Sequence, residues 1–423
     1  MLNRYNNQCL LASTVTRFGS ILALMLASSF FVRAQSSDSS STVHFQGNPF
    51  DVVVSRDSQW IFVSLQGNGA ERTQGIAVLR AQEGRIKLQH IVRMGHSPCG
   101  LILTHDGKLL IAAAQDYVVF FSVDRLITGE SGAAFQWVSD GAKAGSICVN
   151  VTDDDKTLFV SDEFTRTISV MNLDVIRSLG YDSAANFKRL SSQEGASQAI
   201  VGKIPVGGSP VALTFSSDQR LLYTTSEVAP PDLKWPRVIK QENPPRGQTP
   251  RMQPEGAVIV VDVAKAKTDA KNSVVSHIPA GGSPVRLALA PAGDRLFVAA
   301  RNSNAVLVFD TTKFITDPAH AKVATIAVGK SPVPIVLIEN GKMAIVGNSN
   351  RYGPDAAKAS TLSVLDTAKI GTMNSPVIAS IPAGAYPRNF CLSPDGRTLF
   401  LTNFVSDSLQ VMDVSSLPHP EVR

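Results

Sequence analysis

The side chains in this chain best suited to chemistry are two arginines and two glutamates, Arg286, Arg388, Glu163 and Glu227. Guanidinium groups hold carboxylates and phosphates through paired hydrogen bonds, and a carboxylate can accept a proton from an attacking water. Two uses remain open for them: a site for an anionic ligand, or ion pairs that only fix loops in place. With neighbouring amide and basic residues, the candidate ligand-binding set is Glu163, Glu227, Arg286, Arg301, Asn302, Asn348, Arg388 and Asn403.

A repeated sequence unit would bring these side chains to one end of the fold. Seven copies align on a Gly-x-x-Pro step, whose last residue we call the anchor: Pro49, Pro98, Ser146, Pro210, Pro284, Pro332 and Pro387. Eight residues after the anchor an Asp or Asn recurs, with Ala292 as the exception, and thirteen residues after it an aromatic or aliphatic residue recurs. Fixed offsets across seven copies predict a repeat architecture.

Each copy predicts four β-strands. A β-branched apolar run such as PVALTF is typical of a buried strand, and an Asp-Gly turn then closes a hairpin with a run such as LFLTN. Two further apolar runs follow before the next anchor. The fold class is therefore predicted to be all-β: a seven-bladed β-propeller of four-stranded blades.

The ends of the chain predict how the ring closes. The last copy has only three strands, and an unmatched strand, STVHFQ, precedes the first anchor. This N-terminal strand is expected to pair in the last blade and remove an exposed edge. An open array, or two unequal domains, is the alternative.

The repeat resembles the bacterial Tyr-Val-Thr-Asn (YVTN) repeat β-propellers, a group often described as lactonase-like. Phe400-Leu401-Thr402-Asn403 is the copy nearest to that motif, and the resemblance covers residues 41 to about 414. It implies an exported binding or scaffold protein. Because a minority of such proteins hydrolyse sugar lactones, it also implies an alternative, with Glu227 or Glu163 as the base and Arg286 or Arg388 stabilising the oxyanion.

Residues 1–34 are expected to be a cleaved signal peptide, because an apolar run from Phe18 to Val32 follows a stretch with arginines and no acidic residue. This run is short for a bilayer span, which needs about 20 residues; an uncleaved anchor is the alternative. We therefore expect a secreted or periplasmic protein with no transmembrane span after cleavage. Cleavage would leave 37 basic against 35 acidic residues, which disfavours nucleic acid as a partner.

Residues 35–423 are expected to form one propeller domain with insertions at 173–200, 228–255 and 350–359. The proline-rich 228–255 segment is either a lid or partner-binding flap, or a solvated insertion. The first insertion begins with LDVIRSLG, whose spacing of apolar residues predicts a packed surface helix.

Other chemistry has little support in the sequence. The histidines are scattered, no Cys-x-x-Cys occurs, and Asp153-Asp154-Asp155 falls at a hairpin turn, where solvated turn residues are favoured over a calcium site. No metal, cofactor or catalytic residue is assigned. A monomer is expected, binding a small anionic ligand, a glycan or a protein.

Overall fold

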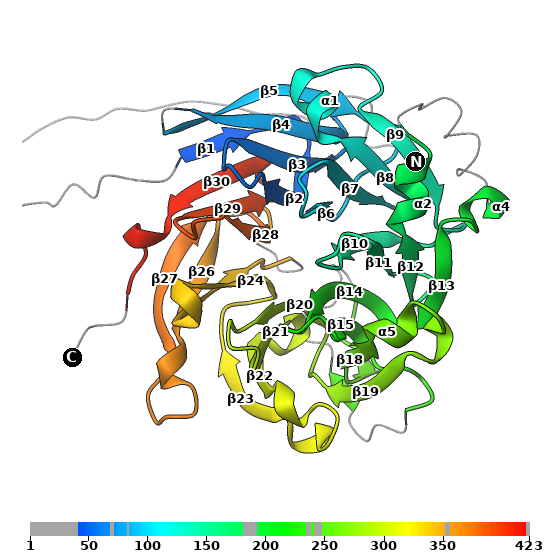
Figure 1. Ribbon diagram of the computed structural model, residues 1–423. Helices are drawn as coiled ribbons and strands as arrows, with labels where there is room; N and C mark the ends of the chain where they lie inside the picture. The colour runs from blue at the N-terminus through cyan, green and yellow to red at the C-terminus, as the bar shows by residue number, and fades with distance from the viewer. Residues whose placement is uncertain are drawn as a thin grey trace, which may run out of the picture. The chain divides into compact units, whose positions relative to one another are not determined.

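The computed structural model describes residues 41–67, 72–82, 84–180, 193–233, 238–240, 248–351 and 356–419. Seven four-stranded antiparallel sheets lie around a central axis, and the chain passes through them in order (Figure 1). The prediction of a seven-bladed β-propeller is confirmed.

The first three blades follow one another from Asn48 to Pro205. Their strands are β2 (Asn48–Val54), β3 (Trp60–Gln66), β4 (Gly75–Gln82) and β5 (Arg85–Arg93); β6 (Leu101–Leu103), β7 (Leu109–Ala114), β8 (Tyr117–Ser122) and β9 (Ala134–Ser139); and β10 (Ser146–Val151), β11 (Thr157–Asp162), β12 (Thr167–Asn172) and β13 (Ile200–Pro205).

Blades four to six repeat the pattern. Their strands are β14 (Gly208–Phe215), β15 (Leu221–Val228), β18 (Ala257–Asp262) and β19 (Val274–Pro279); β20 (Pro284–Leu289), β21 (Arg295–Ala300), β22 (Ala305–Asp310) and β23 (Lys322–Ala327); and β24 (Pro332–Ile338), β25 (Met343–Asn348), β26 (Ser360–Asp366) and β27 (Val377–Ala383).

The seventh blade joins the two ends of the propeller. It contains β28 (Pro387–Leu392), β29 (Thr398–Asn403) and β30 (Ser408–Asp413), and its fourth strand is β1 (Ser41–His44). Ser41 lies opposite Val411 and His44 opposite Ser408, so β1 covers the edge of β30 (Figure 1). The predicted closure is confirmed, and an ion pair between Arg72 and Asp407 links the first and last blades a second time.

The recurring Asp eight residues after the anchor closes the hairpin between the first two strands of a blade. In the fourth blade, Ser216 Oγ donates to Asp218 Oδ1 at 2.6 Å, and the backbone N–H of Arg220 donates to the same oxygen at 3.1 Å. Gln219 between them has φ 59°, so the turn needs one left-handed residue. The same bond from a Ser or Thr hydroxyl occurs at Asp57, Asp106, Asp154 and Asp395. This local bonding explains why Asp recurs there.

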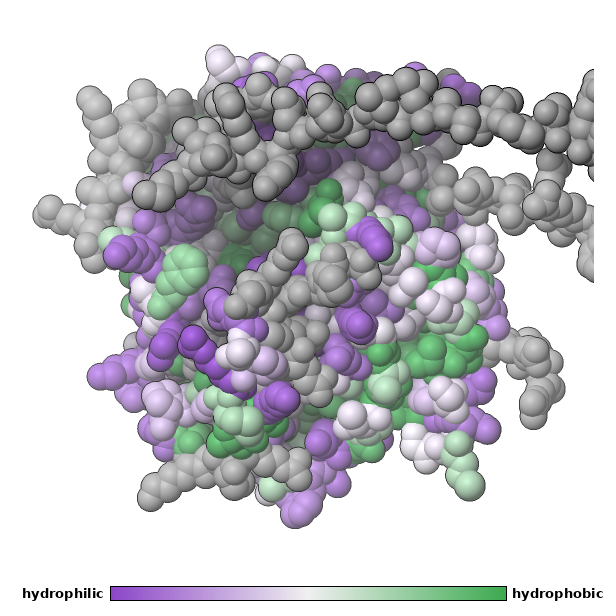
Figure 2. Space-filling view, turned by 180° about the vertical axis from the view of Figure 1, so that it is seen from behind, coloured by the Kyte–Doolittle hydropathy of each residue, from purple (hydrophilic) through white to green (hydrophobic). Residues whose placement is uncertain are grey.

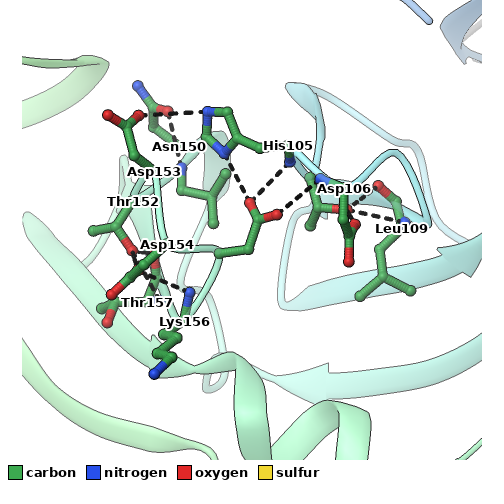
Figure 3. A network of polar contacts seen from close by, with 12 residues as sticks. His105, Asp106, Leu109, Asn150, Thr152, Asp153, Asp154, Lys156 and Thr157 are labelled. Atoms are coloured by element: carbon green, nitrogen blue, oxygen red, sulfur yellow. Dashed lines mark hydrogen bonds and ion pairs between the residues drawn. The ribbon is translucent and has the colours of Figure 1, made fainter. Parts of the chain in front are cut away.

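The run Asp153-Asp154-Asp155 joins two blades, as Figure 3 shows. Asp155 accepts hydrogen bonds from the backbone N–H groups of His105 and Asp106 at 2.9 and 3.0 Å and lies 2.8 Å from His105 Nδ1. Asp154 bonds within its own turn, to Thr152. Across the described part of the chain no group of three metal-binding side chains occurs, and these contacts give the run a structural role.

Short helices follow several of the third strands. They are α1 (Val123–Thr128), α2 (Leu173–Ser178), α4 (Gln193–Ala196) and α5 (Val263–Ala266), with 3-10 turns η1 (Ala270–Asn272), η2 (Arg301–Ser303), η3 (Thr311–Lys313), η4 (Pro318–His320), η5 (Glu339–Gly341), η6 (Thr367–Lys369) and η7 (Val414–Ser416). Helix α2 is the surface helix predicted from LDVIRSLG, and its Leu173 and Ile176 are buried. Among the helices described here, none has the length and apolar character to cross a membrane.

The described parts of the 228–255 insertion lie against the fifth blade. They form a small hairpin of β16 (Val238–Lys240) and β17 (Met252–Pro254). Glu255 Oε1 accepts from the backbone N–H of Gly281 at 2.8 Å, and a side chain at Gly282 would come within 3.0 Å of Ile239. These residues therefore pack on the anchor loop of the fifth blade.

Candidate functional site

Polar residues from all seven blades surround a cavity of about 220 Å³ where the inner strands begin; we call it the upper cavity. Six of the seven inner strands contribute the residue after the anchor. In the third, fourth and fifth blades, the residue that follows the anchor's pairing partner also lines the cavity. The lining residues are Phe50, Gln66, Cys99, Gln115, Gly145, Ser146, Ile147, Glu163, Phe164, Val211, Glu227, Val285, Arg301, Arg351 and Arg388.

An ion pair between neighbouring blades forms part of this wall. Arg301 Nη2 lies 2.5 Å from Glu227 Oε2, and the two side chains are only 8% and 15% exposed. A charge-assisted hydrogen bond shielded from water in this way is stronger than a surface pair. The negative charge of Glu227 is therefore partly neutralised by the protein itself.

Glu163 is the second carboxylate in the cavity. Burial raises its pKa above the usual value of 4.5, and the Glu227 charge raises it further, while Arg388, Arg351 and Arg301 act in the opposite direction. Glu163 thus holds a proton more readily than an exposed glutamate does.

Arg388 is a second deeply buried cation of the upper cavity. It is 7% exposed, stacks over the Phe50 ring at 4.1 Å, and its Nη1 donates to the Tyr386 hydroxyl at 3.4 Å. Of the carboxylates that the structure describes, none lies within ion-pair distance of it. Burial lowers the Arg388 pKa, and repulsion from Arg286 and Arg351 adds to the shift.

The pKa of Tyr386 shows the sign of the electrostatic potential around its side chain. Burial alone would raise its pKa, yet the pKa is lowered, because Arg388, Arg351, Arg301 and Arg286 together favour its anionic form. The wall of the upper cavity around Tyr386 therefore carries an excess of positive charge, which can stabilise a bound anion.

The structure brings four of the predicted residues into the upper cavity and separates the other four from it. Glu163, Glu227, Arg301 and Arg388 line it. Arg286 lies instead in a second cavity along the channel, with Asp51 and Cys148. The expectation that Arg286 and Arg388 share one pocket is therefore not met.

The three asparagines are held by their own blades. Asn348 Nδ2 donates to Thr361 and Ser363 at 3.0 Å each, Asn403 Nδ2 donates to Gln410 at 3.3 Å, and Asn302 Nδ2 donates to Ser283 at 2.7 Å. Asn348 and Asn403 lie directly opposite their anchors, Pro332 and Pro387. None of the three asparagines lines the upper cavity.

Sequence reasoning missed Arg351, Gln66 and Gln115. The glutamines could have been found, because each stands seventeen residues after its anchor, as Glu163, Glu227 and Arg301 do. Arg351 belongs to the 350–359 insertion, where no repeat offset applies. Its guanidinium lies 5.6 Å from the centre of the Tyr386 ring.

The fold and this cavity define the class: a seven-bladed β-propeller with a charged pocket where its inner strands begin. A chain of Kuenenia stuttgartiensis hydrazine synthase is similar over 88% of this chain and 97% of its own, with a TM-score of 0.61 and 15% identity. A chain in the crystal structure of a mitotic checkpoint complex is similar over 96% and 99%, with a TM-score of 0.60 and 15% identity. No protein-family model and no curated protein matches the sequence. These similarities establish the propeller fold alone.

Proposed function

We propose that this protein is a binding module whose upper cavity holds a small organic anion. The observation that carries the proposal is Arg388: a guanidinium 7% exposed, without a carboxylate at ion-pair distance among the described residues, in a cavity that two further arginines line. A buried cation of this kind is costly unless it is paired. A bound anion would supply the missing charge and relieve the repulsion from Arg351.

The size of the cavity favours a small ligand over a glycan or a protein. Its volume of about 220 Å³ lies below the roughly 300–1,000 Å³ of sites for drug-sized molecules. Arginines from different blades can hold a planar carboxylate from two directions, and Phe50 and Phe164 supply apolar contact. A small di- or tricarboxylate satisfies these requirements.

The lactone hydrolase remains the weaker candidate. It requires an arginine at the reacting carbonyl beside the general base. Arg286 lies outside the upper cavity and Glu227 is held by Arg301. Glu163 with Arg388 is therefore the one predicted combination of base and oxyanion donor that the described residues of the cavity offer. Burial raises the pKa of Glu163, so this carboxyl holds a proton more readily than a general base should, and the geometry favours binding.

Export belongs to the same proposal. Residues 1–34 lie outside the described part of the chain, so the signal peptide and its cleavage after Ala34 rest on the sequence, as does the resemblance to the exported YVTN-repeat proteins. N-terminal sequencing of the protein recovered outside the cytoplasm tests this: a mature chain that begins at Gln35 is expected, and a chain that retains Met1 would contradict it.

Calorimetric titration with citrate, succinate and sulfate tests whether the upper cavity binds a small anion. We expect saturable binding by the wild-type chain and a loss of at least tenfold in affinity for Arg388→Met. Arg295→Met is the matched control, because it removes the same charge from a half-exposed pair with Asp310 and does not line the upper cavity. Equal affinities of Arg388→Met and the wild type would contradict the proposal.

A further inference from the structure

A second cavity, of about 280 Å³, lies further along the inner strands; we call it the lower cavity. The residues two positions after the anchors stand at its inner end, among them Asp51, Cys148, Arg286 and Asn389. The residues three and four positions after the anchors also line the lower cavity, and they lie further from the upper cavity. These residues are almost all apolar. The two cavities therefore belong to successive layers of side chains.

Arg286 is a buried cation without an ion-pair partner in the described structure. It is 8% exposed, and its Nη1 donates to Cys148 Sγ at 3.5 Å and to the Val285 carbonyl at 3.3 Å. A thiol and a backbone carbonyl are neutral acceptors, so neither balances the guanidinium charge. Most of the donors of a guanidinium remain available for a ligand.

The nearby acid, Asp51, is engaged elsewhere. Its Oδ1 accepts from the Val52 backbone N–H at 2.7 Å and from Asn389 Nδ2, and its Oδ2 accepts from the Leu101 backbone N–H at 2.8 Å. These bonds tie the first blade to the second and the seventh. Asp51 stays outside ion-pair distance of Arg286; burial raises its pKa, and the Arg286 charge acts in the opposite direction.

The wall beyond Arg286 is an apolar surface in contact with water. Val53, Ile102, Leu287 and Phe390 line the lower cavity, and each is partly exposed although it lies on an inner strand. Apolar side chains around an open cavity gain stability when a ligand covers them, by roughly 25 cal/mol for each Å² removed from water. The lower cavity thus combines one unpaired cation at its inner end with an alkyl-binding wall.

We propose that the lower cavity binds a short aliphatic monocarboxylate, with its carboxylate on Arg286 and its alkyl chain along Val53, Ile102, Leu287 and Phe390. One guanidinium matches one carboxylate by paired hydrogen bonds. One guanidinium does not match a dianion, and the apolar wall disfavours a sugar phosphate. This site is separate from the anion site proposed for the upper cavity and does not depend on it.

A chain-length series on the wild-type protein tests the alkyl wall. We expect the affinity for acetate, butyrate and hexanoate to rise by roughly fourfold for each added methylene, as burial of a CH₂ group predicts. Hexanol, which lacks the charge, is expected to bind at least tenfold more weakly than hexanoate. Hexanoate binding no tighter than acetate, or absent, would overturn the proposal.

Variants then locate the carboxylate. Arg286→Met is expected to weaken hexanoate binding at least tenfold, and Arg286→Lys, which keeps the charge and loses the paired geometry, by an intermediate factor. Glu163→Gln changes only the upper cavity and should leave hexanoate affinity within about twofold. Circular dichroism melting shows whether each variant is folded. Unchanged affinity in folded Arg286→Met would refute the site, and an equal effect of Glu163→Gln would place hexanoate in the upper cavity.

Discussion

Glu227 and Arg301 form a 2.5 Å ion pair although they belong to different blades, and both stand seventeen residues after an anchor. Equivalent positions in adjacent blades are thus direct neighbours at the wall of the upper cavity. The pair fixes the distance between blades four and five. It also sets how much of the Arg301 charge is available to a ligand.

Glu227→Gln should increase the affinity of the upper cavity for sulfate by roughly fivefold, because the carboxylate that competes for Arg301 is removed. The same change should lower the free energy of unfolding by about 1–3 kcal/mol, since a buried guanidinium loses its charged partner. Calorimetric titration and denaturant unfolding measure the two effects. Weaker sulfate binding in the folded variant would show that Glu227 orients Arg301 for the ligand instead of competing with it.

Sulfate affinity should also rise as the pH falls from 7 toward 4.5. Burial and then the Glu227 charge raise the Glu163 pKa above 4.5, so Glu163 gains its proton at a higher pH than an exposed glutamate does and then no longer repels the anion. Sulfate keeps its charge throughout, so the change reports the protein. Glu163→Gln should bind sulfate more tightly at pH 7 and lose most of the pH dependence. A wild-type affinity that is constant across the window would contradict this assignment.

A buried acidic pair in the third blade should make stability fall with rising pH. Ser169 Oγ lies 2.6 Å from Asp140 Oδ1 and 2.7 Å from Asp162 Oδ2, and Lys203 Nζ lies 2.9 and 3.2 Å from the same two carboxyl groups. Burial, reinforced by Asp140, raises the Asp162 pKa well above 3.8. An acid whose folded pKa is raised loses stability as the pH rises from its unfolded value through its folded value.

Asp162→Asn should therefore flatten this pH dependence and raise the free energy of unfolding at neutral pH by about 1 kcal/mol. The chain itself shows that an amide fits, because Asn348 and Asn403 stand at the equivalent positions opposite their anchors. Denaturant unfolding of both proteins from pH 4 to 8 measures this change in the free energy of unfolding. The reverse change in the sixth blade, Asn348→Asp, should lower the free energy of unfolding at neutral pH by more than about 1 kcal/mol, because it buries an unpaired carboxylate. A large loss of stability in Asp162→Asn would show that Lys203 needs both charges.

The sequence predicted the blades better than the site for a physical reason. Offsets of eight and thirteen residues from the anchor mark a turn and a core position, which all seven copies need. The site depends on a difference of one position: Asn348 lies opposite its anchor and bonds within its own blade, whereas Arg301, one place past the residue opposite its anchor, lines the upper cavity. A step of one residue exchanges the two faces of a strand, so composition at a strand end cannot separate them.

Arg351 and Arg286 show two other limits. Arg351 comes from an insertion, and no periodic pattern predicts where an inserted loop places a side chain. Arg286 was predicted to share a site with Arg388, but the layer it occupies follows from the strand register, which the bulge between Pro284 and Arg286 shifts. Bulges redirect side chains and leave no clear sequence signal.

The closure of the ring yields the last prediction. Phe45 follows β1, is 8% exposed, and packs in the hydrophobic cluster shared by the first and seventh blades, while its backbone N–H donates to the Asp407 carbonyl at 2.8 Å. Phe45→Ala should lower the free energy of unfolding by about 3–5 kcal/mol, because it leaves a cavity where the two ends of the propeller meet.

Val405→Ala is the matched control for this prediction. Val405 lies in the same blade but is 40% exposed, so its truncation should cost less than about 0.5 kcal/mol. Denaturant unfolding compares the two variants. Figure 2 shows one face of the propeller, on which hydrophobic residues lie exposed among hydrophilic ones. The free energy of unfolding could instead fall no more in Phe45→Ala than in Val405→Ala. In that case β1 covers the edge of β30 without holding the ring closed, and the stability of the propeller depends on contacts between the inner strands.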